Sequence, residues 1–436
     1  MDKKALLNWK VHVLAILLSV IAELIGITRF TTGIGVILFL PLLYAFIFAL
    51  VFNENVAPSI GKHLGQNSSN IASQWVLIGI MPFIAKFGVG IGPNIDKIIA
   101  AGPALILQEI GNVATALFAL PVAVLIFKMG REAIGATHSI AREPNIALVA
   151  DKYGLKSAEG VGVMGVYVMG TLFGTIYFSI MAGLFASWDL FDYRALAMAC
   201  GVGSGSMMGA CSAALGEVLP QFKEDITAFA ASSNLLTYAT GLFVSAFVAL
   251  PFTEGLYKLL KSFSKGKGTE NSELAQLTAQ SGADYTEEKE VSLSITETAL
   301  ALILSSFVGL IVNWVNNPAN DILTALPGMA IFWACSLVGL IIYKYVKIGV
   351  PAVAWISTVA IIISLPQFPL SAQVAAYTNK VGFLPLLTPV LAYAGLAISK
   401  MEIKLFKAAG FKIAIIALLA FTGTYVGSVI IAQAML

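Results

Sequence analysis

Residues 201–212 combine glycines and serines within a chain whose other segments are typical of membrane helices. The segment is Gly-Val-Gly-Ser-Gly-Ser-Met-Met-Gly-Ala-Cys-Ser, and its hydroxyl groups belong to Ser204, Ser206 and Ser212. A bilayer supplies no water to unpaired backbone groups, so broken helices persist at membrane depth only where they are buried in protein or line a wet cavity. Transporters hold polar solutes at such breaks. The composition therefore favours a binding element over simple close packing of small residues.

Glu109 is an ionisable residue in the middle of the long apolar stretch 98–127, and Asn112 follows it by three residues. A charged side chain at that depth costs at least about 2.5 kcal/mol, so we expect it to face a partner or a wet cavity. The functional interpretation is a carboxylate that binds a coupling cation or carries a proton. The structural alternative is a pair with Lys86 or Lys97, or a position near an interface.

Two further stretches carry candidate residues. In 130–139, Arg131 could hold a substrate carboxylate bidentately, although an arginine at a cytoplasmic helix end also fixes topology. In 226–252, Ser233 and Asn234 offer oxygen atoms, which hard cations prefer, although serine also bonds back to its own helix. The predicted substrate-binding residues are Arg131, Thr137, Ser139, Ser204, Ser206 and Ser212. The predicted residues for ion or proton coupling are Glu109, Asn112, Ser233 and Asn234.

The composition indicates an integral membrane protein. Of the 436 residues, 58% are hydrophobic and 11% are charged, against about 25% charged in soluble domains. The net charge of +2 gives no indication of nucleic-acid binding. Neither a nucleophile with its base nor a metal-ligand cluster is evident, so we expect no enzyme activity and no cofactor other than Na⁺ or H⁺ as coupling ion. The cysteines Cys200, Cys211 and Cys335 all lie in apolar segments and predict no disulfide framework.

The apolar stretches predict an all-α polytopic fold with about eleven transmembrane helices and two re-entrant hairpins, at 130–150 and 195–218. The predicted crossings are 11–28, 33–53, 73–92, 98–127, 161–186, 226–252, 294–316, 324–346, 350–368, 380–398 and 411–434. Lys3, Lys4 and Lys10 place the N-terminus in the cytoplasm, because basic residues concentrate on that side. The crossing count then gives the two hairpin units opposite orientations, which predicts an inverted repeat.

The same pattern predicts four parts. Residues 1–129 form scaffold helices, 130–252 a central transport core, 253–293 a hydrophilic cytoplasmic linker and 294–436 the C-terminal helices. The linker is rich in Ser, Gly, Thr and Gln and ends in Glu287-Glu288-Lys289-Glu290, a composition typical of a flexible connection.

Residues 151–186, which begin Asp-Lys-Tyr-Gly-Leu-Lys-Ser-Ala-Glu-Gly-Val-Gly-Val-Met-Gly-Val-Tyr-Val-Met-Gly-Thr-Leu-Phe-Gly-Thr, resemble a segment of the sodium/glutamate symporters. The stretch 201–217 is similar to the re-entrant loops of that family and of the 2-hydroxycarboxylate/sodium symporters. The resemblance covers about 90 residues and implies an inverted-repeat fold that moves anionic amino or hydroxy acids. The families' usual Gly-Gly-rich hairpin signature is not intact, and both hairpins lie together in mid-chain.

From these observations we expect a secondary active transporter in a cytoplasmic membrane of bacterial type. It would move a small organic anion, such as an amino acid or a carboxylate, by cation-coupled symport. The alternative is a passive channel or holin-like exporter, whose flux would neither saturate nor depend on an ion gradient. The expected partners are the organic anion and the lipid bilayer, and the apolar scaffold helices are compatible with a homodimer.

Overall fold

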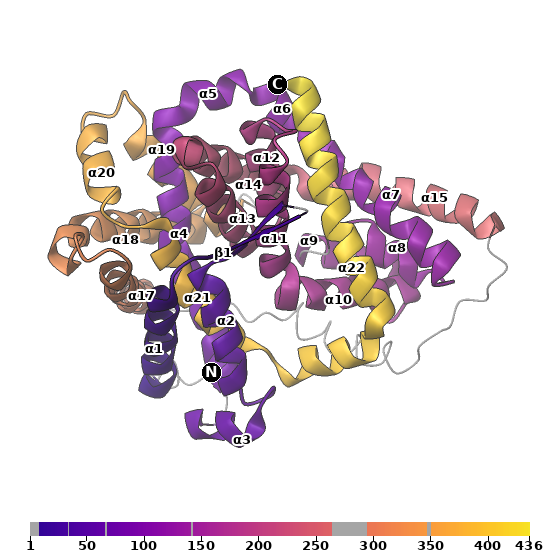
Figure 1. The fold of residues 1–436 in the computed structure, drawn as a ribbon, viewed down its shortest axis with the longest axis horizontal. Helices are drawn as coiled ribbons and strands as arrows, with labels where there is room; N and C mark the ends of the chain where they lie inside the picture. The colour runs from indigo at the N-terminus through magenta and orange to yellow at the C-terminus, as the bar shows by residue number, and fades with distance from the viewer. Residues whose placement is uncertain (1–7, 34, 66–67, 141–142, 264–293, 347–349) are drawn as a thin grey trace. The chain divides into compact units, whose positions relative to one another are not determined.

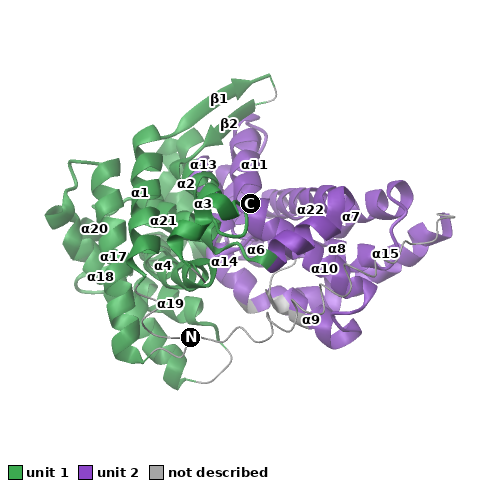
Figure 2. Ribbon diagram, turned by 90° about the horizontal axis from the view of Figure 1, so that it is seen from below, with its two compact units in different colours: residues 1–100, 216–231, 290–400 green, residues 101–215, 232–289, 401–436 purple. Residues whose placement is uncertain are grey.

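The computed structural model of the chain is almost entirely helical, with one short β-hairpin (Figure 1). It describes residues 8–33, 35–65, 68–140, 143–263, 294–346 and 350–436. The chain divides into two compact units, each assembled from separate stretches (Figure 2). Unit 1 comprises residues 1–100, 216–231 and 290–400, and unit 2 comprises residues 101–215, 232–289 and 401–436. The predicted division into scaffold, transport core, linker and C-terminal helices stays a prediction, and residues 264–293 of the linker lie outside the described residues.

Unit 1 is built around helix α4 (Ser68–Ile91), which packs against α17, α18, α19 and α21. Trp75 of α4 is 1% exposed, and its ring lies 4.5 Å from that of His12 and 6.1 Å from that of Tyr393. The first and the last helices of the unit therefore share one core. The other elements of unit 1 are α1 (Trp9–Ile25), β1 (Thr28–Thr32), β2 (Gly35–Phe39), α2 (Pro41–Phe52), α3 (Pro58–Gly61), α5 (Ile95–Ala100), α17 (Ile295–Asn316), α18 (Ile322–Tyr345), α19 (Ala352–Ser364), α20 (Ser371–Thr378) and α21 (Phe383–Ala397).

Unit 2 contains several helices that are interrupted along their length. A 3₁₀ segment, Gln108–Val113, separates α6 (Gly102–Leu107) from α7 (Ala114–Pro121), and π turns follow α7, α10 and α14. The other helices are α8 (Glu132–Thr137), α9 (Glu143–Tyr153), α10 (Ala158–Met169), α11 (Thr175–Ser187), α12 (Tyr193–Cys200), α13 (Gly205–Val218), α14 (Lys223–Val244), α15 (Leu250–Phe263) and α22 (Lys400–Met435). The last residues of α13 and the first of α14 belong to unit 1.

Glycines bring helix α22 into backbone contact with the 3₁₀ segment. A Cβ added at Gly427 would lie 2.6 Å from Cβ of Ala114 and would also collide with the carbonyl oxygen of Gly111. A Cβ at Gly423 would lie 2.5 Å from the carbonyl oxygen of Ala114. Small residues at four-residue spacing allow membrane helices to approach closely. This packing places the neighbouring Thr424 and Ser428 beside the 3₁₀ segment.

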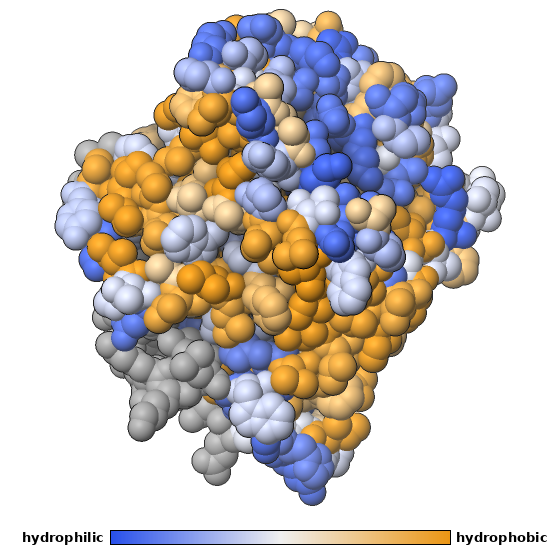
Figure 3. Space-filling view, turned by 90° about the vertical axis from the view of Figure 1, so that its left-hand side faces the viewer, coloured by the Kyte–Doolittle hydropathy of each residue, from blue (hydrophilic) through white to orange (hydrophobic). Residues whose placement is uncertain are grey.

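The helices are those of a membrane protein. Six helical stretches of the described chain are long and apolar enough to cross a bilayer: Ser68–Ala100, Gly102–Ile126, Ala158–Ser187, Ile295–Asn316, Ile322–Tyr345 and Lys400–Met435. The bent pair α20 and α21, which meet at 59°, would add a seventh. Hydrophobic residues cover much of the face drawn in Figure 3, and α17 and α18 contribute exposed apolar side chains such as Leu300 and Leu323. The all-α class is confirmed, whereas eleven crossings, the inverted repeat and the side of the N-terminus stay predictions.

The prediction of one continuous crossing at 33–53 is wrong. Residues 28–32 and 35–39 form the antiparallel pair β1 and β2, in which Thr28 lies opposite Phe39 and Thr32 opposite Gly35. Only twelve residues, Pro41–Phe52, are helical. Three threonines in β1 and the β-branched residues of β2 favour strands, and the glycines at 33 and 35 favour a tight turn.

Both predicted hairpin segments contain a helix, a break and a second helix. Residues 195–218 lie in α12, the break 201–204 and α13, whereas 130–150 lie in α8 and α9, with 141–142 outside the described residues. A Cβ at Gly135 of α8 would collide with the backbone of Glu159 in α10. The first segment is therefore packed tightly against α10. Entry of the two segments from opposite membrane faces stays a prediction.

Candidate functional site

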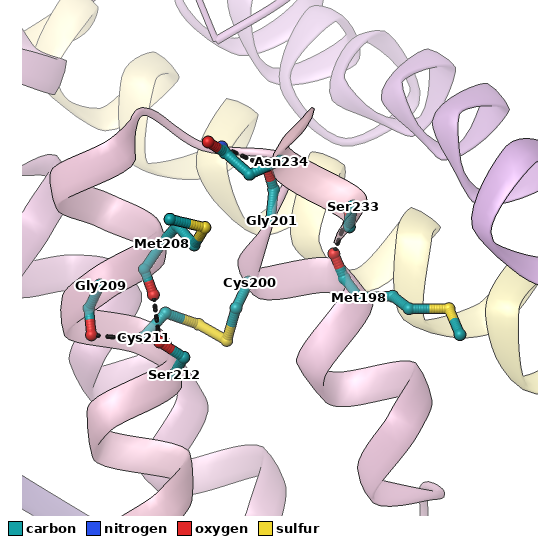
Figure 4. Close-up of a disulfide and its surroundings, with 9 residues drawn as sticks. All are labelled: Met198, Cys200, Gly201, Met208, Gly209, Cys211, Ser212, Ser233 and Asn234. Carbon is teal, nitrogen blue, oxygen red and sulfur yellow. Dashed lines mark hydrogen bonds between the residues drawn. A yellow bond between two sulfur atoms is a disulfide. The ribbon is translucent and has the colours of Figure 1, made fainter. Parts of the chain in front are cut away.

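Asn234 on α14 holds the break between α12 and α13. Its Nδ2 donates to the carbonyl oxygens of Gly201 at 2.7 Å and Gly203 at 2.8 Å. The preceding residue, Ser233, donates its hydroxyl to the carbonyl of Met198 at 2.7 Å, at the end of α12 (Figure 4). Carbonyl groups freed by a broken helix need donors when they are buried. Adjacent residues of one helix thus supply donors to both the break and the helix end before it.

Glu109 lies in the 3₁₀ segment and is 2% exposed. Its Oε1 accepts from Nε2 of Gln108 at 2.9 Å and from the hydroxyl of Thr237, and its Oε2 accepts from Nδ2 of Asn112 at 3.2 Å. Gln108 also donates to Ser233 at 3.0 Å. The structure therefore joins Glu109, Asn112 and Ser233, three of the four predicted coupling residues, in one buried network. The fourth, Asn234, follows Ser233 directly.

The Thr237 hydroxyl has two acceptors. It lies against Oε1 of Glu109 and is also 2.9 Å from the carbonyl oxygen of Ser233, one helical turn earlier in α14. A hydroxyl carries one hydrogen and can donate to only one of them at a time. When it donates to Ser233, its oxygen can accept a hydrogen from a protonated carboxyl group of Glu109. The geometry is thus compatible with a protonated and with an ionised Glu109.

Helix α22 completes this network through residues that the sequence analysis did not single out. Thr424 donates its hydroxyl to Oδ1 of Asn112, and Ser428 donates to the carbonyl oxygen of Gln108 at 3.2 Å. The available signal was the pair Gly423 and Gly427, each followed by a hydroxyl residue. Oε1 of Gln108 is buried and has no hydrogen-bond partner in the described part of the chain. It is a free acceptor at the edge of the network.

Ser204 and Ser206 are the predicted substrate residues that the structure brings together. Their hydroxyl oxygens are 3.1 Å apart, and the hydroxyl of Thr175 on α11 lies 3.3 Å from that of Ser206. Both serines are partly exposed, unlike the buried glycines of the same break. The oxygen of Ser204 also accepts from the backbone N–H of Met207 at 3.3 Å, in the first turn of α13. Three hydroxyl groups therefore cluster where α13 begins.

The remaining predicted substrate residues have partners of other kinds. Ser212 is buried, and its hydroxyl lies within hydrogen-bond distance of the carbonyl oxygens of Met208 and Gly209 in its own helix (Figure 4). Thr137 donates to Ala133 at 2.8 Å, and Ser139 lies 3.3 Å from Nε2 of His138. These three side chains are not part of the hydroxyl cluster.

Arg131 forms an ion pair with Glu159 of α10, a partner that the sequence analysis missed. Its guanidinium lies 5.9 Å from the ring centroid of Tyr153, whose hydroxyl bonds to Glu254 of α15. That hydrogen bond lowers the pKa of Glu254. Arg131 therefore belongs to a charged cluster at the ends of α8, α10 and α15.

The lysines considered as structural partners of Glu109 have contacts elsewhere. Lys97 forms an ion pair with Asp225, with its Nζ 2.7 Å from Oδ1. Lys86 donates to the carbonyl oxygen of Thr378 at 2.9 Å, at the end of α20. Both lysines therefore contact other residues, and the role of Glu109 in ion or proton coupling stays a prediction.

Cys200 and Cys211 form a disulfide across the break, with their Cα atoms 5.4 Å apart (Figure 4). The sequence-based prediction of no disulfide is wrong for this pair. Cys200 ends α12 and Cys211 lies in the second turn of α13, so the break folds the two thiols toward each other. The bond and Asn234 act on the same segment from different sides of it.

Comparison with known proteins places much of the chain in a family. Residues 20–259 match a family described as a protein of unknown function (DUF3100), a stretch that includes Glu109, Ser204 and Asn234. No curated protein matches the chain, and no solved structure matches it. The resemblance to sodium/glutamate and 2-hydroxycarboxylate symporters is thus an expectation that no match supports. Because the matched residues make up more than half of its length, the chain belongs to the DUF3100 family.

Proposed function

We propose that this protein is a secondary active transporter that couples movement of a small organic anion to protons. The observation that carries the proposal is the contact between Glu109 and Thr237. A buried carboxyl group whose hydroxyl neighbour can donate either to it or to Ser233 can lose and regain a proton without losing all its hydrogen bonds. Ionisable groups within membrane segments commonly mark ion and proton paths.

The substrate contact is assigned to the hydroxyl cluster of Ser204, Ser206 and Thr175. The amide groups of the first turn of α13 lie beside it, and a helix N-terminus favours negative charge. Asn234 and Ser233 connect this break to the Glu109 network through adjacent positions of α14. A change of protonation at Glu109 is thereby linked to the segment that would contact the anion.

The test uses the full chain in liposomes of phosphatidylcholine with a trapped pH-sensitive dye. Glutamate, succinate, malate and citrate are added one at a time, with and without an inward proton or sodium gradient. We expect saturable uptake of at least one anion together with protons, loss of that uptake in Glu109→Gln, and normal uptake in Glu224→Gln. Glu224 is an exposed carboxylate in the first turn of α14 and serves as the control.

Three outcomes would count against the proposal. Uptake by Glu109→Gln at the normal rate would exclude the residue from coupling. Flux that does not saturate and ignores both gradients would indicate a passive channel. Uptake that depends on the sodium gradient alone would indicate that sodium, not the proton, is the coupling ion. The side-chain oxygens of Gln108 and Glu109 are the available ligands for it.

A further inference from the structure

A second buried carboxyl group lies in unit 1. Glu23, in the last turn of α1, is 6% exposed. Its Oε1 lies 2.6 Å from the hydroxyl oxygen of Thr388 on α21, and its Oε2 accepts from Nδ2 of Asn316 at 2.7 Å. Both partners are neutral. They come from positions 365 and 293 residues away in the sequence, so the fold assembles this site.

The Thr388 hydroxyl is shared in the same way as that of Thr237. Besides Glu23, it lies 3.1 Å from the carbonyl oxygen of Leu384, four residues earlier in α21. With one hydrogen available, it donates either to Leu384 or to Glu23. In the first case the 2.6 Å contact needs a hydrogen on Glu23, which then donates to Thr388. In the protonated form both carboxyl oxygens of Glu23 have a hydrogen-bond partner.

The sites of Glu23 and Glu109 therefore share the same arrangement of hydrogen-bond partners. In each, a threonine bonded back to the carbonyl four residues before it contacts one carboxyl oxygen. In each, an asparagine amide donates to the other oxygen. One site lies in each compact unit.

No cation of the described residues forms an ion pair with Glu23. Helix α1 packs against α2, α4, α17 and α21, and the titratable groups of all five helices are engaged elsewhere. Nδ1 of His12 lies 2.8 Å from the hydroxyl oxygen of Tyr393. Lys10 donates to the carbonyl oxygen of His63, and Lys86 donates to that of Thr378. The Tyr44 hydroxyl donates to that of Thr28, and Glu297 accepts from the hydroxyl of Ser294. A buried carboxylate without a countercharge is costly in free energy, and this cost favours the protonated form of Glu23.

The β-hairpin gives this group a route to water. Among the described residues its two strands pair with each other, and the strand Thr28–Thr32 is largely exposed. Unpaired strand edges are not stable in hydrocarbon, so we expect the hairpin to lie at the membrane surface. Glu23 lies in the last turn of α1, which ends at Ile25, three residues before Thr28. We therefore expect only a short path between Glu23 and water.

We propose that Glu23, Thr388 and Asn316 form a second proton-binding site, matched to the one at Glu109. The site requires neither a substrate nor coupled transport, so it goes beyond the proposed function. A chain with both sites binds two protons in two separate units.

The test is infrared spectroscopy of the full chain in phosphatidylcholine liposomes, equilibrated over a pH series. Protonated carboxylic acids absorb apart from carboxylates, and we expect Glu23→Gln to lose one component of the acid band that the wild type and Glu224→Gln retain. Glu109→Gln should lose a different component and keep that of Glu23. A Glu23→Gln spectrum equal to that of the wild type at every pH would overturn the proposal.

A second variant keeps the test decisive if Glu23→Gln does not fold. Thr388→Val retains the shape of the side chain and the carboxyl group but removes the shared hydroxyl. We expect the acid component to remain and to shift in frequency, because a hydrogen bond to the carboxyl group is lost. An unchanged band in Thr388→Val would refute the site. Failure of transport would leave these spectra unaffected, so the two proposals fail independently.

Discussion

The contact between α22 and the 3₁₀ segment offers a quantitative test of how the Glu109 network is held in place. In Gly427→Ala, the new methyl group would lie 2.6 Å from Cβ of Ala114 and against the carbonyl of Gly111. Both neighbours are main-chain atoms or are attached directly to the main chain, so the helices must separate. Overpacking of this kind costs about 1–3 kcal/mol. Alanine returns about 0.5–1 kcal/mol through its better helix propensity, which leaves a net loss of up to about 2.5 kcal/mol.

The control is Gly255→Ala in α15. Gly255 is exposed, and a Cβ at this position would have no neighbour within 4 Å. Only the propensity gain of about 0.5–1 kcal/mol applies there. Because both variants share this gain, they are expected to differ in unfolding free energy by the overpacking cost alone, about 1–3 kcal/mol.

The measurement is the denaturation of purified protein in detergent micelles, followed by tryptophan fluorescence. Gly427→Ala should unfold at lower temperature than the wild type and Gly255→Ala at the same or a higher temperature. Gly427→Ala should also lower proton-coupled uptake, because Thr424 and Ser428 move away from Asn112 and Gln108. Equal stability of the two variants would show that the close approach of α22 is not present.

Two further variants test other parts of the site. Asn234→Ala removes the donors to two buried carbonyl groups, and each loss costs about 1–3 kcal/mol. The thermal denaturation midpoint of this variant should therefore fall well below that of Ser212→Ala, because the Ser212 hydroxyl bonds only within its own helix. Equal midpoints would refute the role of Asn234. Asp192 caps α12 and is bonded to Arg194, which lowers the pKa of Asp192. The contribution of Asp192 to the unfolding free energy is therefore fully present above the unfolded-state pKa of about 3.9 and is lost as the pH falls through the lower pKa of the folded state. Asp192→Asn should reduce stability at pH 7 by at most about 1 kcal/mol and converge with the wild type in strong acid, and a difference that persists there would contradict the ion-pair explanation.

The sequence identified Glu109 because a carboxylate stands out within an apolar stretch, and its partner Thr237 lies in a helix that also carries Ser233 and Asn234. Glu23 was missed for the opposite reason. It is close to the end of an apolar stretch, where a carboxylate is typical of an interface, and its partners are distant in sequence. Cys200 and Cys211 were missed because apolar surroundings indicate packing, whereas the break between them decides their distance. Pairing across a fold cannot be inferred from composition.

The helix count shows the same limit. Hydrophobicity located the stretches 73–92, 98–127, 161–186, 294–316, 324–346 and 411–434, each of which coincides with a long apolar helix. Hydrophobicity could not distinguish a helix from a strand at 35–39, because the hydropathy of Val and Ile is the same in both. It also could not show that 371–397 bends by 59° between α20 and α21.

The covalent link between Cys200 and Cys211 limits how the interrupted region can move. The two residues are 11 positions apart in the chain, so the bond closes a small ring that contains the whole interruption. While the disulfide is intact, the end of α12 and the beginning of α13 cannot move apart, and residues 201–204 between them cannot extend. In any displacement of this region the end of α12 and the second turn of α13 therefore stay close together, and the two helices can turn relative to each other but cannot separate at this point.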